Sequence, residues 1–286
     1  MSSHRPARLL TSWLLVICAW SVTAQDVALP SAANSVKFAA IGDAGTGESP
    51  QYDIANLMAR MHARFPFDRV IMLGDNIYGG QGPADLARKF SQPYKSLLDM
   101  GVTFYASIGN HDDPRNVGFA PWHMGGERYY TYATKNVRFF ALDSNKVDQK
   151  QLTWLESALK SAGEDWKICY FHHPMYSDGG SHGSSIDVRV RFEQLFLSYG
   201  VNVVFSGHDH IYERLKPQKG IYYFVSGAGG ELRKGDTRPS AMTAKSFDQD
   251  QSFMLVEIAG DVLSFQSISR AGTIVDSGTI QRQGRR

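Results

Sequence analysis

The sequence predicts an α/β fold built as a four-layer αββα sandwich, in which two mixed β-sheets pack face to face and helices flank both. Short apolar runs alternate with helical patterns along most of the 286-residue chain, which is typical of α/β proteins. Two further stretches each contain strand-like runs on either side of a turn sequence, and this pattern predicts antiparallel hairpins. This many strands would make one open sheet very broad, so we expect two sheets.

The first strands and helices are predicted from their hydrophobic pattern. Five short apolar runs read as buried strands, at residues 36–41, 69–73, 103–108, 168–171 and 202–205. Ile54, Leu57, Met58 and Met61 recur at i, i+3, i+4 and i+7 and form one apolar helical stripe. Similar stripes are formed by Leu152, Leu155 and Leu159, by Val188, Phe192, Leu195 and Tyr199, and more loosely by Leu86, Phe90, Leu97 and Leu98.

The hairpins are predicted at residues 129–142, with a turn near Lys135 and Asn136, and at residues 253–280, with turns at 260–261 and 271–272. Residues 227–251 form a long, polar, glycine-containing segment, which predicts a loop. Long loops in compact domains are often functional.

Residues 1–24 are predicted to be a signal peptide. Basic residues precede a short apolar run at 9–20, and a small-residue end follows at 22–24. The run is shorter than the roughly 20 apolar residues that a spanning helix needs. We therefore expect a secreted or periplasmic protein with no membrane attachment after cleavage, and one domain over residues 35–286.

Charge and cysteine content limit the partners of the cleaved chain. Cleavage would remove Arg5 and Arg8, so Lys and Arg would fall from 30 to 28 and equal the 28 Asp and Glu residues. A neutral chain gives no electrostatic basis for nucleic acid as the main partner. Only Cys169 would remain, which excludes an internal disulfide and predicts a buried thiol. We expect a monomer.

Polar residues suited to metal binding follow the predicted strands directly. The segments are GDAG at 42–45, GDNIY at 74–78, GNHD at 109–112, HHP at 172–174 and GHDH at 207–210. They contain five of the eight histidines that would survive cleavage. Loops at the carboxyl ends of strands face the ligand crevice in α/β sheets, so we expect these side chains to converge.

The order GDxG, GDxxY, GNH[DE], HxP and GHxH resembles the purple acid phosphatases of the calcineurin-like metallophosphoesterases, in their small single-domain form. The similarity extends from about residue 36 to residue 230 and includes QLTWL at 151–155 and SGAG at 226–229. The resemblance implies that residues 35–286 are a metallophosphoesterase domain. Five motifs in the same order at similar spacing make this a specific signal.

The resemblance implies a binuclear metal centre with one shared carboxylate. One site would consist of Asp43, Asp75, Tyr78 and His210, and the other of Asp75, Asn110, His172 and His208. A phenolate beside carboxylates suits Fe(III), whereas imidazoles and an amide oxygen suit a divalent ion such as Fe(II), Zn(II) or Mn(II). Asp112 and Asp209 are expected to orient neighbouring histidines.

The implied activity is that of an acid phosphatase, a hydrolase that cleaves small phosphate monoesters by attack of a metal-bound hydroxide. His111 and His182 are the candidates to protonate the leaving group, and His111, His173 and His182 are expected to contact substrate. Two alternatives stay open: a phosphodiesterase or nucleotide pyrophosphatase of the same superfamily, and a noncatalytic metal-binding module.

Overall fold

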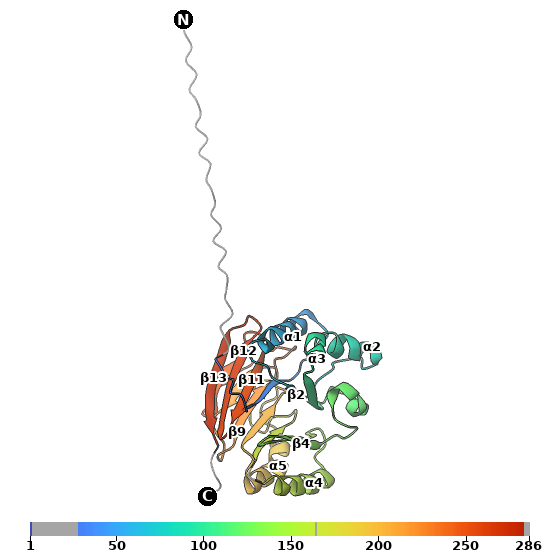
Figure 1. Cartoon of the computed structure of the whole chain (residues 1–286), viewed down its shortest axis with the longest axis vertical. Coiled ribbons are helices and arrows are strands. Elements are labelled where there is room, and N and C mark those ends of the chain that lie inside the picture. The colour runs from blue at the N-terminus through green and yellow to red at the C-terminus, as the bar shows by residue number, and fades with distance from the viewer. Residues whose placement is uncertain (2–27, 164, 283–286) are drawn as a thin grey trace.

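The structure is a computed structural model that describes residue 1, residues 28–163 and residues 165–282. Apart from Met1, the predicted signal peptide lies outside these residues. In the described part, a six-stranded and a seven-stranded sheet pack against each other, and helices cover their outer faces (Figure 1). The predicted αββα sandwich of two mixed sheets is confirmed.

The six-stranded sheet has the order β13-β12-β11-β1-β2-β3. Its parallel strands are β1 (Val36–Ile41), β2 (Arg69–Leu73) and β3 (Thr103–Ser107). Its antiparallel strands are β11 (Ser252–Ala259), β12 (Val262–Ser269) and β13 (Ile274–Gln281). The two predicted turns of this hairpin region, at 260–261 and 271–272, are therefore confirmed.

The seven-stranded sheet has the order β10-β8-β9-β7-β6-β5-β4. Its parallel strands are β5 (Val137–Ala141), β6 (Trp166–Tyr170), β7 (Val203–Ser206) and β9 (Tyr222–Ser226). Antiparallel strands at its two ends are β4 (Tyr130–Thr134), β8 (Tyr212–Leu215) and β10 (Thr243–Phe247). The predicted hairpin at 129–142 is confirmed.

The expectation of a loop throughout residues 227–251 was wrong in part, because this segment contains β10. The strand lies at the edge of its sheet and pairs only with β8. Its sequence, TAKSF, has no apolar face, and its residues are exposed or half-buried. Backbone pairing with β8 forms the strand, and a hydrophobic pattern cannot reveal such an interaction.

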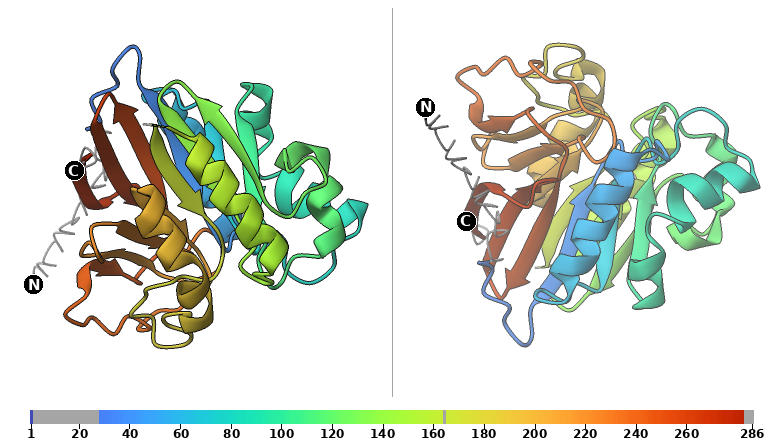
Figure 2. Two further views of the ribbon diagram at one scale, coloured as in Figure 1. Left: turned by 90° about the horizontal axis from the view of Figure 1, so that it is seen from below. Right: turned by 90° about the horizontal axis from the view of Figure 1, so that it is seen from above.

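Helices cover opposite outer faces of the sandwich (Figure 2). On the six-stranded sheet lie α1 (Ser49–His62), α2 (Pro83–Leu86) and α3 (Lys95–Asp99), with a π-helical turn at Ala87–Ser91. On the seven-stranded sheet lie α4 (Gln149–Ser161) and α5 (Ile186–Tyr199). Two 3₁₀ turns, Pro114–Gly118 and Ala120–Trp122, follow β3. The loose stripe between Leu86 and Leu98 thus reflects three short helical pieces.

The central strands are buried on both faces. Phe38 of β1 points between the sheets and contacts the rings of Phe139 and Phe205, with centroids 5.3 and 5.9 Å away. Its neighbour Ala39 belongs to the core beneath α1. Adjacent residues of a strand face opposite layers, so a strand between two cores is apolar throughout.

Cys169 in β6 is a buried free thiol, as its apolar surroundings predicted. Burial raises the pKa of this thiol well above its usual value, which makes it a poor nucleophile. Across the described residues, the helices are all too short or too polar to span a bilayer.

Candidate metal centre

The loops that follow β1, β2, β3, β6 and β7 meet at one edge of the sandwich. The Asp43 amide donates to the carbonyl of Gly74 at 3.0 Å, and the Gly207 amide donates to the carbonyl of His172 at 3.0 Å. Asp43, Asp75 and His208 have positive φ values of 55°, 50° and 70°. Such conformations cost about 1–3 kcal/mol each and cluster at functional sites. The chain therefore turns sharply after β1, β2 and β7.

The first group of donor atoms surrounds the hydroxyl of Tyr78. Its Oη lies 3.1 Å from Oδ1 of Asp43 and 3.2 Å from Nε2 of His210. His210 Nε2 lies 3.4 Å from the same Asp43 oxygen. The aspartate and the histidine are buried and the tyrosine is half-buried.

The second group surrounds Nε2 of His172. This atom lies 3.0 Å from Oδ1 of Asn110, 3.1 Å from Nδ1 of His208 and 3.3 Å from Oδ2 of Asp75. Ligand atoms of Asp43, Asp75 and His172 all lie within 4.8 Å of one another, so the two groups are contiguous. The structure thus brings together all seven residues that the resemblance implies as ligands: Asp43, Asp75, Tyr78, Asn110, His172, His208 and His210.

The protonation pattern at His172 fits a site for cations. Its Nδ1 lies 3.0 Å from the carbonyl oxygen of Leu73, which can only accept a hydrogen bond, so Nδ1 carries a proton. In the neutral ring, Nε2 then points a lone pair at the lone pairs of Asn110 and Asp75. A positive charge between these atoms resolves the repulsion, and metal-ligating histidines typically donate their other N–H in this way.

Titration properties of the donors agree with this fit. Burial opposes a charge on His172, yet Asp43 and Asp75 raise its pKa to about 9, so the carboxylates favour a positive charge there. Burial and the charge of Asp43 raise the pKa of Tyr78 well above its usual value. A phenolate at this position therefore needs a nearby cation. Burial and neighbouring His172 lower the pKa of His208 to about 2, which keeps its ring in the neutral form that binds metals.

Three further histidines lie around the mouth of the cluster. His111 is exposed; its ring lies 4.8 Å from that of Tyr78, and its backbone N–H donates to Oδ1 of Asp75 at 2.9 Å. His182 is exposed, and its ring centroid lies 4.1 Å from that of His208. His173 is half-buried, with its ring 4.4 Å from that of His208.

Among the described residues, the two neighbouring aspartates bind loop amides and a hydroxyl, so any effect on the neighbouring histidines acts through these loops. The buried Asp112 carboxylate accepts hydrogen bonds from the amides of Gly109 at 2.8 Å and Ile77 at 2.9 Å. Asp209 accepts from the hydroxyl of Ser177 and the amide of Gly183, which flank His182 in sequence. Asp112 therefore joins the loops after β2 and β3, and Asp209 holds the loop that carries His182.

Two residues that the sequence did not single out hold the same loops in place. Gln81 accepts from the amide of Asp113 at 2.6 Å and donates to the carbonyl of His111. Lys89, only 4 % exposed, donates to the carbonyls of Tyr78 and Gly80. A lysine in a helical pattern usually lies in solvent, so only its buried carbonyl partners reveal this role.

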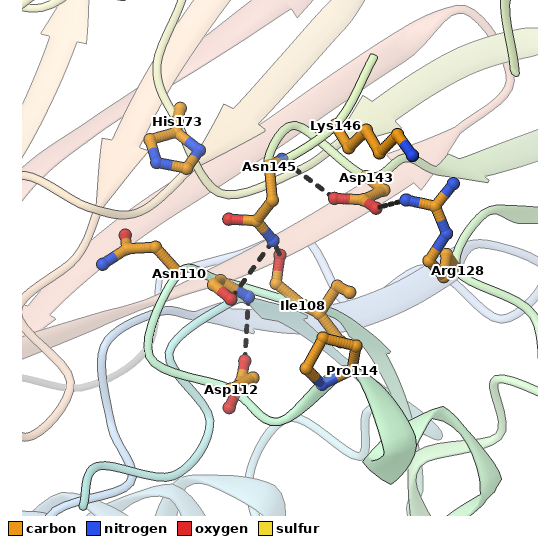
Figure 3. A pocket seen from close by; sticks show the side chains of 10 residues that line it. Ile108, Asn110, Asp112, Pro114, Arg128, Asp143, Asn145, Lys146 and His173 are labelled. Carbon is orange, nitrogen blue, oxygen red and sulfur yellow. Dashed lines mark hydrogen bonds and ion pairs between the residues drawn. The ribbon is translucent and has the colours of Figure 1, made fainter. Parts of the chain in front are cut away.

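A pocket of about 740 Å³ adjoins the donor cluster. Asn110 and His173 lie on one side of it, and Arg128, Asp143 and Lys146 lie on the other (Figure 3). Arg128 forms an ion pair with the buried Asp143 carboxylate, which fixes that wall. The volume is in the range of small-molecule sites.

Proteins similar to this chain in sequence include phosphoesterases and acid phosphatases. Residues 36–212 match the calcineurin-like phosphoesterase family. The human tartrate-resistant acid phosphatase type 5 is 25 % identical over 317 residues, covering 91 % of this chain and 97 % of its own. The probable purple acid phosphatase 20 of Arabidopsis thaliana is 26 % identical over 231 residues, covering 69 % of this chain and 52 % of its own.

Solved structures share the fold. GAP50, described as the anchor in the inner membrane complex of Plasmodium, superposes with a TM-score of 0.79 at 18 % identity, covering 88 % of this chain and 90 % of its own. A purple acid phosphatase from yellow lupin seeds superposes with a TM-score of 0.72 at 20 % identity, covering 89 % of this chain and 55 % of its own. At these identities the likeness concerns the fold alone.

Proposed function

The chain belongs to the calcineurin-like phosphoesterase family, and we propose on that basis that it is an exported acid phosphatase. It would hydrolyse small phosphate monoesters at a binuclear metal centre. The observation that carries the proposal is the convergence of seven donor residues from five loops on one cluster, with a tyrosine among them. Membership of the family and similarity to acid phosphatases support a phosphoester hydrolase.

Two sets of donors would hold the ions. Asp43, Tyr78 and His210 form an anionic, oxygen-rich set that suits Fe(III), and Asn110, His172 and His208 suit Fe(II), Zn(II) or Mn(II). Asp75 would serve both, because its carboxylate has two oxygens near the boundary of the two groups. When bound, the ions supply an activated water and positive charge for the phosphoryl oxygens.

The histidines at the mouth would contact the substrate. His111 and His182 are exposed beside buried donors, so their rings can reach an ester held over the cluster. Either could donate a proton to the departing alkoxide. His173 is mostly unprotonated above about pH 4, because burial and neighbouring His172 lower its pKa to about 4, so it rarely carries a proton to donate. Its Nδ1 also lies 3.0 Å from the Ser144 hydroxyl, so we assign it a role in positioning the substrate.

The leaving group would occupy the adjoining pocket. Asn110 and His173 belong both to this pocket and to the surroundings of the donor cluster. An ester bound over the cluster can therefore extend its organic part toward Arg128 and Lys146 (Figure 3). The volume of the pocket suits the organic part of a small phosphate ester.

Turnover of p-nitrophenyl phosphate and of bis(p-nitrophenyl) phosphate by the metal-containing protein tests the proposal. We expect faster hydrolysis of the monoester, with an optimum at acidic pH. Faster hydrolysis of the diester would favour a phosphodiesterase or pyrophosphatase, and turnover of neither would favour a noncatalytic metal-binding module. Amino-terminal sequencing of the exported protein tests the signal peptide, and we expect it to begin at Gln25.

A further inference from the structure

Residues 229–233 lie against the loops of the donor cluster. The amides of Gly230 and Glu231 donate to the carbonyl of Asp43 at 3.1 and 3.0 Å, and the amide of Arg233 donates to the carbonyl of His210 at 3.1 Å. A Cβ atom on Gly230 would lie 2.4 Å from the carbonyl oxygen of Ala44, so glycine permits this close approach. The segment is therefore fixed beside two of the proposed ligands.

The Arg233 side chain is half-buried, and its Nη1 is buried without a hydrogen-bond partner. Within the part of the chain that the structure describes, its guanidinium forms no ion pair. Buried guanidinium groups are normally paired or hydrogen-bonded, because burial removes water from their five N–H donors. The guanidinium of Arg233 can therefore bind an anion that is not part of the chain.

Arg233 and His182 flank neighbouring ligands of the donor cluster. The backbone of Arg233 is bound to the carbonyl of His210, and the His182 ring packs on that of His208, with centroids 4.1 Å apart. An anion at the mouth of the site would therefore lie close to two basic side chains, which favours its binding.

The same chain segment fixes His182. The Asp236 carboxylate accepts from the hydroxyl of Ser181 at 2.9 Å and from its amide at 3.2 Å. The Gly180 amide donates to the carbonyl of Asp236 at 2.7 Å. Residues 229–236 therefore hold Arg233 and the loop of His182 in a fixed relationship.

We propose that Arg233 is a substrate-binding residue whose guanidinium pairs with a phosphoryl oxygen and favours monoesters over diesters. This inference rests on the proposed function. A monoester has three non-bridging oxygens and up to two negative charges, whereas a diester has two such oxygens and one charge. Arginine binds phosphate through parallel N–H groups, so the extra oxygen and charge of a monoester would strengthen the contact.

The variants Arg233→Gln and Lys234→Gln test the inference in the metal-containing protein. Lys234 is the matched control, because it is an exposed cation on the same segment. We expect Arg233→Gln to lower kcat/KM for p-nitrophenyl phosphate by about 10- to 100-fold, as is typical of a lost charge-assisted hydrogen bond. Lys234→Gln should change it by less than about twofold, since an exposed charge contributes little.

Two further readouts identify what is lost. Inhibition by inorganic phosphate should weaken in Arg233→Gln in parallel with monoester turnover, while turnover of bis(p-nitrophenyl) phosphate falls less. Arg233→Lys should recover part of the phosphate affinity, because it restores charge without the paired N–H groups. Unchanged phosphate inhibition and an unchanged monoester-to-diester ratio in Arg233→Gln would overturn the inference.

The experiments also distinguish an incorrect phosphatase assignment from an incorrect role of Arg233. Wild-type protein that hydrolyses neither ester would refute the phosphatase assignment. Calorimetric titration with inorganic phosphate would still compare wild type with Arg233→Gln. Equal phosphate affinity of the two proteins would refute the role of Arg233 independently.

Discussion

Gly109 and Asp75 approach so closely that a Cβ atom on Gly109 would lie 2.1 Å from Oδ1 of the Asp75 carboxylate and 2.3 Å from the Asp75 nitrogen. The Gly109 amide also donates to Asp112 at 2.8 Å. Only glycine, which has no Cβ atom, fits at this position of the GNH motif without a steric clash. It lets the loop after β3 bring Asn110 and His111 against the carboxylate that would join the two metal sites.

Gly109→Ala should disturb that carboxylate. We expect a loss of stability of about 1–3 kcal/mol, as is typical of overpacking, together with reduced metal content. Thermal unfolding and metal analysis measure both effects. Gly118→Ala is the control, since a Cβ there meets nothing within 4 Å. Wild-type metal content in Gly109→Ala would show that the close approach is dispensable.

Asp75→Asn should be the most damaging single change among the seven proposed ligands, because it weakens both sites at once. We expect activity to fall by more than the roughly 10- to 100-fold that is typical when a residue hydrogen-bonded to a metal ligand is replaced. Metal analysis by mass spectrometry should find fewer than two ions per chain. Two ions and normal turnover would contradict the bridging role.

Tyr78→Phe should remove the colour of the iron-containing protein. A phenolate bound to Fe(III) gives a visible charge-transfer band, and phenylalanine has no oxygen to bind the metal. The visible spectrum measures the band, and unchanged thermal unfolding would show that the fold is intact. A wild-type protein that is fully active, colourless and free of iron would refute the ferric assignment.

Glu213 should make the protein less stable as pH rises. Burial raises the pKa of this carboxyl from 4.5 to about 7, and the charge of neighbouring Asp178 adds to the shift. The folded state therefore binds a proton that the unfolded state releases, so the stabilisation is complete below the unfolded pKa and is lost as pH rises through the folded one.

Glu213→Gln mimics the protonated form and should remove this dependence. Relative to the variant, wild type should lose at most about 2–3 kcal/mol between roughly pH 5 and pH 8. Urea unfolding at both values measures the difference. Parallel pH profiles for the two proteins would show that Glu213 does not titrate in this range.

Some elements escaped recognition for identifiable reasons. The strand β8 contains Glu213 and Arg214, and charged residues obscure the apolar pattern of a buried strand. Arg214 is paired with Asp276 of β13 at 2.8 Å, and Glu213 accepts from the Asp178 amide at 2.8 Å. Glu213 is buried and Arg214 is half-buried, and their partners are remote in sequence, so the place of both side chains in the strand follows from the tertiary structure.

The sequence by itself determined the sandwich, the order of its first strands and helices, and the five loops with residues suited to metal binding. These features are local, because strand and helix periodicity and the glycine-flanked motifs are encoded in neighbouring residues. Only the tertiary structure decided that Gln81 and Lys89 hold the Tyr78 and His111 loops, that Asp112 binds backbone amides, and that the Arg233 amide binds the carbonyl of His210. Such roles depend on which distant atoms meet once the chain has folded, and no local pattern records those distances.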